Sequence, residues 1–181
     1  MNVRDERRRA ALERMADHLL REGLGGASLR PLAAAAGTSD RMLLYYFTDK
    51  DELLAATLGH IAAHLARLLD EAVPVQPQRP FPALLVEVWA VVRAPALRPF
   101  MRLWLELAAS ASRGQEPHHA IAGQIADGFL AWVASRLHVE RETDRAPQAA
   151  LLLATVDRLA LLDGIGRGDA ADGAVAARAA S

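Results

Sequence analysis

The chain has no cysteine among its 181 residues. This absence excludes disulfides, thiolate metal sites and cysteine nucleophiles, and it makes the cytoplasm the expected location. Aromatic residues make up only 5% of the sequence, so alanine, leucine and valine must supply most of the core, which favours helices. No apolar run approaches the roughly 18 residues of a membrane span, and the charged N-terminus does not resemble a signal peptide. We therefore expect no membrane association.

Positive and negative side chains are nearly equal in number, and the net charge is −1. The first 50 residues carry a net +2 and the remaining residues a net −3, so the excess of one sign is small in both parts. Any phosphate binding must therefore come from the local placement of cations rather than from a strong overall field.

Apolar residues recur at helical spacing throughout, and no segment has the alternation of a strand, so the sequence predicts an all-α fold. Glycines at 23, 25 and 26 end the first helix, and prolines at 74, 77, 80 and 82 mark a loop. The tail after Gly164 is read either as a short helix or as a frayed end. The expected helices after the first are 28–36, 39–47, 50–73, 81–93, 96–113, 116–138 and 146–163.

Residues 28–50 predict a helix-turn-helix. Small residues at Ala33 and Ala36 allow two helices to cross closely, and Gly37 supplies a bend that side chains resist. Ser28 and Ser39 stand where N-caps are needed, and Thr48 with Asp49 begins the next helix. The second short helix is then free to enter a major groove.

The segment SLRPLAAAAGTSDRMLLYYFTDKDELL, residues 28–54, closely resembles the signature of the tetracycline-repressor (TetR) family. The resemblance covers residues 5–60 directly. The rest agrees in layout, with RLWLEL around Trp104 and LLDGI around Gly164 resembling weaker landmarks of that family. It implies a DNA-binding domain over 1–50 and a helical effector-binding and dimerisation domain over 51–181.

The resemblance also implies the residues that meet double-stranded DNA. Ser28, Tyr46 and Lys50, which is the only lysine in the chain, would contact phosphate. Arg41 would grip guanine with two hydrogen bonds. Met42 and Tyr45 would also contact base edges, and Asp40 would be near enough to accept from a cytosine amino group. Ser39, the expected cap of this helix, completes the expected DNA-binding residues. Leu44 stands where many members carry tyrosine and Arg41 where they often have a small residue, which bears on specificity.

Several of these features have a second interpretation. Tyr45, Tyr46 and Phe47 suit a core, and Phe47 suits it best. The basic run 7–9 fits either a phosphate-tracking arm or a solvated helix start. His60 and His64 have the spacing of a metal chelate, but no third ligand is near, so we expect no metal and no cofactor.

A ligand pocket is predicted in the second half of the chain. The large aromatics concentrate there, methionine adapts to varied ligands, and members of the resembling family usually keep an effector site in this region. A packed core is the alternative, and Arg102 with Glu106 is either a solvated pair or a polar anchor for the ligand. The predicted lining residues are Phe81, Leu85, Val88, Trp89, Phe100, Met101, Trp104 and Leu105.

A homodimer is predicted because a single recognition helix covers only a few base pairs, and two copies on a palindrome are needed for useful specificity. The last two long helices are the expected interface, through an apolar face that would close a four-helix bundle. Packing within one subunit is the alternative for the same face. The predicted interface residues are Phe129, Trp132, Val133, Leu152, Val156 and Leu159.

Together these features predict a cytoplasmic transcriptional regulator, acting as a repressor that a small, mostly apolar ligand releases from its operator. Two alternatives remain open: a DNA-binding dimer governed by a protein partner or by nothing, and a ligand-binding bundle or enzyme. We expect no enzyme, because the chain offers no nucleophile elbow, no paired catalytic carboxylates and no phosphate-cradling glycine loop.

Overall fold

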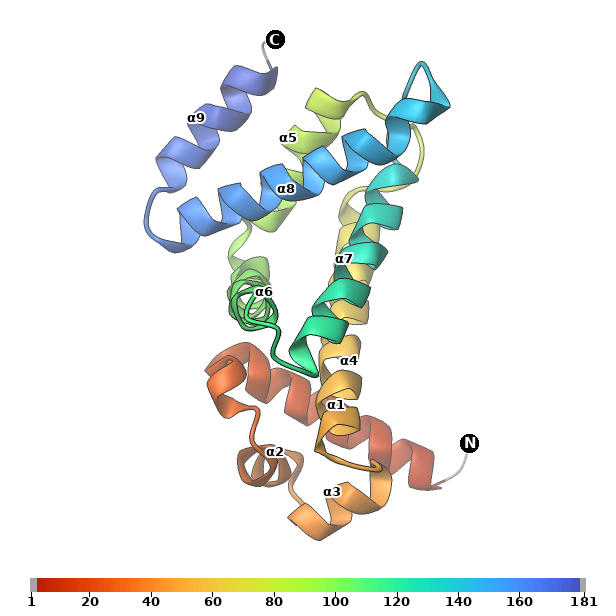
Figure 1. Ribbon diagram of the computed structural model, residues 1–181, viewed down its shortest axis with the longest axis vertical. Helices are drawn as coiled ribbons and strands as arrows, with labels where there is room; N and C mark the ends of the chain where they lie inside the picture. The colour runs from red at the N-terminus through yellow and green to blue at the C-terminus, as the bar shows by residue number, and fades with distance from the viewer. Residues whose placement is uncertain (1–2, 180–181) are drawn as a thin grey trace. The chain divides into compact units, whose positions relative to one another are not determined.

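The computed structural model describes residues 3–179, and within that range the chain forms nine α-helices (Figure 1). The only strand-like pairing there is an isolated bridge between Arg79 and Leu137. The all-α prediction is therefore confirmed. The helices are α1 (Val3–Glu22), α2 (Leu29–Ala36), α3 (Asp40–Tyr46), α4 (Lys50–Ala72), α5 (Phe81–Val92), α6 (Arg98–Ala111), α7 (His118–Ala134), α8 (Arg145–Gly164) and α9 (Gly168–Ala179).

Most helix ends lie within a few residues of the predicted ones. The tail after Gly164 forms an ordered helix, α9, which buries Ala171 and Val175. The largest difference is at the end of α7, which stops at Ala134 rather than His138 because residues 136–138 exchange backbone hydrogen bonds with Arg79. None of the helices between residues 3 and 179 is long and apolar enough to cross a membrane.

The chain packs into two compact units, and α4, α6 and α7 each contribute residues to both. The first unit holds the chain up to His64 together with Arg102–Ala122, and the second holds Leu65–Met101 and the chain from Gly123 onward. This division differs from the predicted boundary after Lys50, because α4 begins at that residue and continues without a break to Ala72.

In the first unit, α1 buries an apolar stripe that includes Leu12, Met15 and Leu19. Two side chains of α6 close the end of α1. Arg102 Nη2 donates to the carbonyls of Leu20 and Arg21 at 2.8 and 2.7 Å, and the Glu106 carboxylate accepts from the Leu24 N–H at 2.6 Å.

Gly23, where α1 gives way to the next turn, has φ of +74°, and a Cβ on it would lie 2.5 Å from a Glu106 oxygen. Arg102 and Glu106 are therefore neither a merely solvated pair nor an anchor left free for a ligand. They act as a cap on α1.

In the second unit, the core is formed mainly by α5, α8 and α9, with Val133 near the end of α7 and Leu137 three residues beyond that end. The Trp89 indole N–H donates to Asp172 Oδ1 at 2.9 Å, and Arg93 pairs with the other oxygen of that carboxylate. Trp89 thus joins α5 to α9 with both its apolar body and its polar edge.

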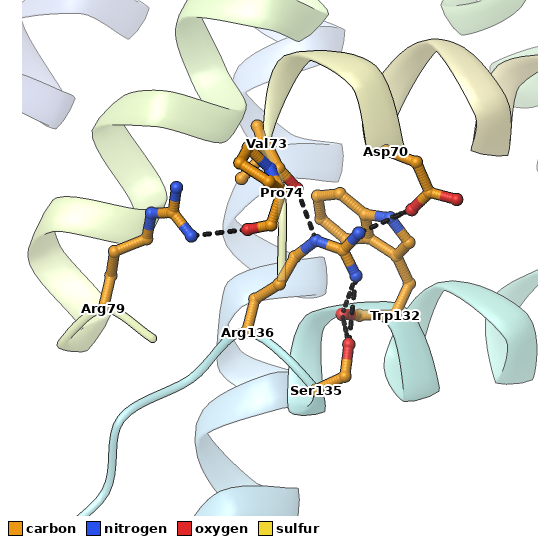
Figure 2. A network of polar contacts seen from close by, with 7 residues as sticks. All are labelled: Asp70, Val73, Pro74, Arg79, Trp132, Ser135 and Arg136. Atoms are coloured by element: carbon orange, nitrogen blue, oxygen red, sulfur yellow. Dashed lines mark hydrogen bonds and ion pairs between the residues drawn. The ribbon is translucent and has the colours of Figure 1, made fainter. Parts of the chain in front are cut away.

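Arg136 is the centre of a polar network in this unit (Figure 2). Its side chain is 3% exposed, and its Nε donates to the Val73 carbonyl at 2.7 Å. Its Nη2 meets Asp70 Oδ1 at 2.5 Å, and its guanidinium carbon lies 4.0 Å from the centre of the Trp132 ring. Burial lowers the pKa of Arg136 from its ordinary value, and the Asp70 charge opposes that shift. The network joins the end of α4 to the end of α7.

Candidate DNA-binding interface

A three-residue turn, 37–39, joins α2 to α3, so the predicted helix-turn-helix is present (Figure 1). Gly37 has φ of +69°, a left-handed conformation that favours glycine, and its N–H closes the end of α2. Arg14 of α1 donates to the Ala36 carbonyl at 3.1 Å. Ala33 and Ala36 are buried, as a close helix crossing requires.

The recognition helix α3 has one buried side and one exposed side. Leu43 and Phe47, the latter at the end of the helix, are fully buried and hold it on the unit, which confirms the core interpretation of Phe47. On the other side Met42 is 38% exposed and Tyr45 is 59% exposed, and Asp40 and Arg41 are exposed as well. The candidate base-reading residues therefore all face solvent.

The starts of α2, α3 and α4 place the candidate phosphate contacts. Ser39 caps α3 as predicted, because its Oγ accepts from the Met42 N–H at 3.3 Å. Ser28 has the extended backbone of an N-cap, but its side chain makes no capping bond, so this part of its predicted role is wrong. The Ser28 hydroxyl is exposed and does not cap α2. The Lys50 side chain, at the start of α4, is exposed as well. Tyr46 is half-buried.

A capping box fixes the first turn of α4. Asp49 Oδ1 accepts from the Glu52 N–H at 2.8 Å, and Glu52 Oε2 accepts from the Thr48 N–H at 2.5 Å. The hydrogen bonds from Thr48, with a smaller contribution from Arg8, lower the pKa of Glu52 from its ordinary value. The backbone around Lys50 is thereby held in place.

Arginines of α1 contact the ends of the neighbouring helices. Arg4 donates to the Tyr45 carbonyl at 3.2 Å and lies 5.0 Å from the centre of the Tyr45 ring. Arg8, in the basic run, lies 4.6 Å from the centre of the Phe47 ring and 3.6 Å from Glu52. Arg8 is thus engaged within the protein. Sequence reasoning missed the role of Arg4, because helix periodicity gives no sign of a contact 41 residues away.

The model of the bacterial regulatory proteins of the tetR family matches residues 12–57, a range that contains all eight of the predicted DNA-binding residues. Residues 12–57 are thus similar to the N-terminal region of the tetR family, which consists of bacterial regulatory proteins. This match supports a TetR-family regulator.

Among similar proteins, the transcriptional regulator BetI of Pseudomonas fluorescens is 29% identical over 104 residues, which cover 54% of this chain. The match spans about half of BetI, 53% of its length. A TetR-family regulator from Rhodococcus sp. superimposes with a TM-score of 0.73 at 22% identity, covering 96% of this chain and 97% of the other.

A second similar structure is that of the multidrug binding protein EbrR complexed with proflavin. It superimposes with a TM-score of 0.65 at 21% identity, covering 95% of this chain and 99% of that one. At these identities the two structural likenesses show the fold alone.

The predicted pocket residues are divided between the two units. Phe81, Leu85, Val88 and Trp89 are buried in the core of the second unit, with Met101 packed against it. Phe100 is buried in the same unit, whereas Trp104 and Leu105, both half-buried, belong to the first. The pocket between α5 and α6 stays a prediction.

Sequence reasoning missed a cavity of about 210 Å³ that includes two of these side chains. It lies within the second unit, and its walls are mostly apolar with one cation. The lining residues are Phe81, Leu85, Leu151, Thr155, Leu159, Ala174, Val175 and Arg178.

Four of the predicted dimer residues are covered by their own chain. Val133, Leu152, Val156 and Leu159 are buried in the core of the second unit, while Phe129 and Trp132 are half-buried and stacked at 5.6 Å between ring centres. The opposite face of α8 is exposed at a regular spacing of three and four residues: Leu151, Ala154, Arg158, Leu161 and, just after the helix, Ile165. Because α8 is apolar on more than one face, its sequence does not show which face is buried within its own chain and which is exposed.

Within residues 3–179, no three His, Cys, Asp or Glu side chains are grouped so that they could hold a metal ion.

Proposed function

We propose that the chain is a homodimeric transcriptional repressor that binds a palindromic DNA operator through α3 and releases it when a small, mostly apolar molecule binds to the body. The observation that carries the proposal is the exposed side of α3, where Arg41 and Tyr45 stand one helical turn apart on a helix anchored by Leu43 and Phe47.

DNA recognition would divide between base-reading and positioning residues. Arg41 is the candidate for a bidentate contact to guanine, with Asp40, Met42 and Tyr45 beside it. Lys50, Ser28 and Tyr46 would contact phosphate, and Ser39 would hold the start of α3. The capping box formed by Asp49 and Glu52 around Lys50 supports its role, because it fixes the backbone from which the exposed lysine side chain extends.

Dimerisation would use the exposed face of α8 together with α7. The exposed residues of α8 at 151, 154, 158, 161 and 165 form the stripe expected of helices that pack in a bundle across a two-fold axis. Val133, Leu152, Val156 and Leu159 would support that stripe from behind, and Phe129 and Trp132 would flank it.

Ligand control would act through α4, which begins at Lys50 and whose last turn carries Asp70 of the Arg136 network. A ligand shifts an equilibrium only by its different affinity for the two states, and coupling of about 1–3 kcal/mol is typical. Binding of proflavin by EbrR, a protein of the same fold, supports a ligand site in the body. The candidate site is the predicted lining on α5, where Phe81 and Leu85 also border the cavity within the second unit.

The experiment that tests this function compares Arg41→Ala with Lys50→Ala on a duplex that the protein itself selects from a randomised pool. Lys50→Ala should weaken binding to all sequences alike and reduce the slope of log affinity against log salt by about one unit, because one phosphate contact is lost. Arg41→Ala should cost roughly 1–3 kcal/mol on the selected duplex and relax the preference at one position.

Arg141→Ala is the matched control, since Arg141 lies on the exposed turn before α8 and pairs with Asp144 three residues away. It should leave both the affinity and the salt slope unchanged. Equal, sequence-blind losses from Arg41→Ala and Lys50→Ala would contradict the assignment.

A further inference from the structure

We propose that Leu44 is a base-reading residue of α3 that contacts the C5-methyl group of a thymine close to the guanine assigned to Arg41. The proposal rests on the proposed DNA binding and adds a base and a residue to it. It starts from an unusual surface: Leu44, a large apolar side chain next to the fully buried Leu43, is 43% exposed.

Exposed large apolar side chains are concentrated on this short helix. In the described part of the chain eight such side chains are exposed, and Met42, Leu44 and Tyr45 are three of them, within the seven residues of α3. A solvated helix face has no need of them, and such clustering marks a surface that meets a partner. Two cations accompany this cluster, the exposed Arg41 on the same helix and Arg4 at the Tyr45 ring, and they favour a polyanion over an apolar protein surface.

Leu44 differs from Met42 and Tyr45 in its position on the helix and in its contacts within the protein. The Tyr45 ring faces the Arg4 guanidinium at 5.0 Å and meets the Tyr46 ring at 5.5 Å between centres, so its place is set from within the protein. Met42 lies on the first turn, where its N–H bonds to Ser39. Leu44 lies three residues after Arg41, which makes the two side chains neighbours on one helix face.

A leucine side chain has no hydrogen-bonding group, so it can discriminate between bases only by apolar contact. The apolar group that bases present in the major groove is the thymine methyl. Since residues three apart on a helix have Cβ atoms about 5–6 Å apart, and base pairs rise about 3.4 Å, the thymine should lie within about two base pairs of the guanine.

The test removes that methyl group from the DNA. A duplex is selected from a randomised pool by the native protein, each thymine in it is replaced singly by uracil, and affinities are measured by fluorescence anisotropy. We expect one thymine in each half-site whose replacement weakens binding of the native protein about fourfold, the effect of burying one methyl-sized group. Leu44→Ala should bind the thymine and uracil duplexes equally well.

Two control variants locate the effect. Met42→Ala should keep the sensitivity to uracil at that position, and Val86→Ala, which truncates an exposed apolar side chain on α5, should keep both affinity and sensitivity. Unchanged thermal unfolding of Leu44→Ala would show that its fold is intact.

The outcomes separate the two proposals. If no sequence is enriched from the pool, the proposed function itself is wrong. If a sequence is enriched but uracil has no effect at any position, or Leu44→Ala remains as sensitive as the native protein, DNA binding stands and the role of Leu44 is overturned. Loss of the sensitivity in Met42→Ala instead would assign the methyl contact to Met42.

Discussion

Replacing Arg136 by methionine should destabilise the second unit by about 2–3 kcal/mol. Methionine keeps much of the apolar stem but removes every bond of the guanidinium. The loss is unequal among the partners. The Asp70 side chain is 57% exposed and can rebind water, whereas Val73 is fully buried and its carbonyl would lose the Nε donor at 2.7 Å.

An unsatisfied buried carbonyl costs about 1–3 kcal/mol, and loss of the cation contact with the Trp132 ring adds about 1 kcal/mol. Relief of the cost of burying a charge offsets part of this sum. For a chain of this length each kcal/mol lowers the unfolding temperature by about 2–4 °C.

Urea unfolding followed by circular dichroism measures the effect, with Arg141→Met as the matched control. The Arg141 side chain is 78% exposed and pairs with Asp144 on the same turn, so its loss should cost under about 0.5 kcal/mol. Asp70→Asn, which keeps an oxygen for the Trp132 N–H, should cost no more than about 1 kcal/mol. If Asp70→Asn destabilised the protein as much as Arg136→Met, the ion pair rather than the Val73 carbonyl would be the main stabilising contact, and our reasoning would be refuted.

Two further predictions concern the body. Ile165→Arg places a charge on a side chain that is 65% exposed, so it should leave the fold intact but give monomers in sedimentation and weak operator binding; a variant that still sediments as a dimer would place the interface elsewhere. Leu159→Arg would not test the dimer interface, because Leu159 is buried in its own chain and its replacement should unfold the second unit. With proflavin as the probe, ligand and selected duplex should weaken each other's binding by the same factor, and Trp104→Ala should lose this coupling while its duplex affinity without ligand stays near normal. Proflavin that binds without changing the duplex affinity of the native protein would show that this ligand is not coupled to DNA binding.

Much of the candidate DNA-binding interface could be predicted because its signals are local. The bend at Gly37, the cap at Ser39 and the buried Phe47 each depend on residues a few positions apart, and the structure confirms all three. Local signals also placed most helix ends within a few residues.

What could not be predicted depends on contacts between distant segments. Arg102 and Glu106 look like an ordinary pair four residues apart, and nothing near them in the sequence indicates the end of α1, some 80 residues earlier. The faces of α8 are ambiguous for another reason. Leucine and alanine occur on both its buried and its exposed side, so periodicity alone does not show which face packs against α5.

The most direct test of the central claim is selection of DNA by the native protein from a pool of randomised duplexes, followed by sequencing. If α3 reads the major groove in a two-fold dimer, the enriched duplexes will share an inverted repeat whose half-site centres lie about one or two helical turns apart, at multiples of roughly 10 base pairs. Enrichment of no sequence, or of a single site without a repeat, would contradict the account.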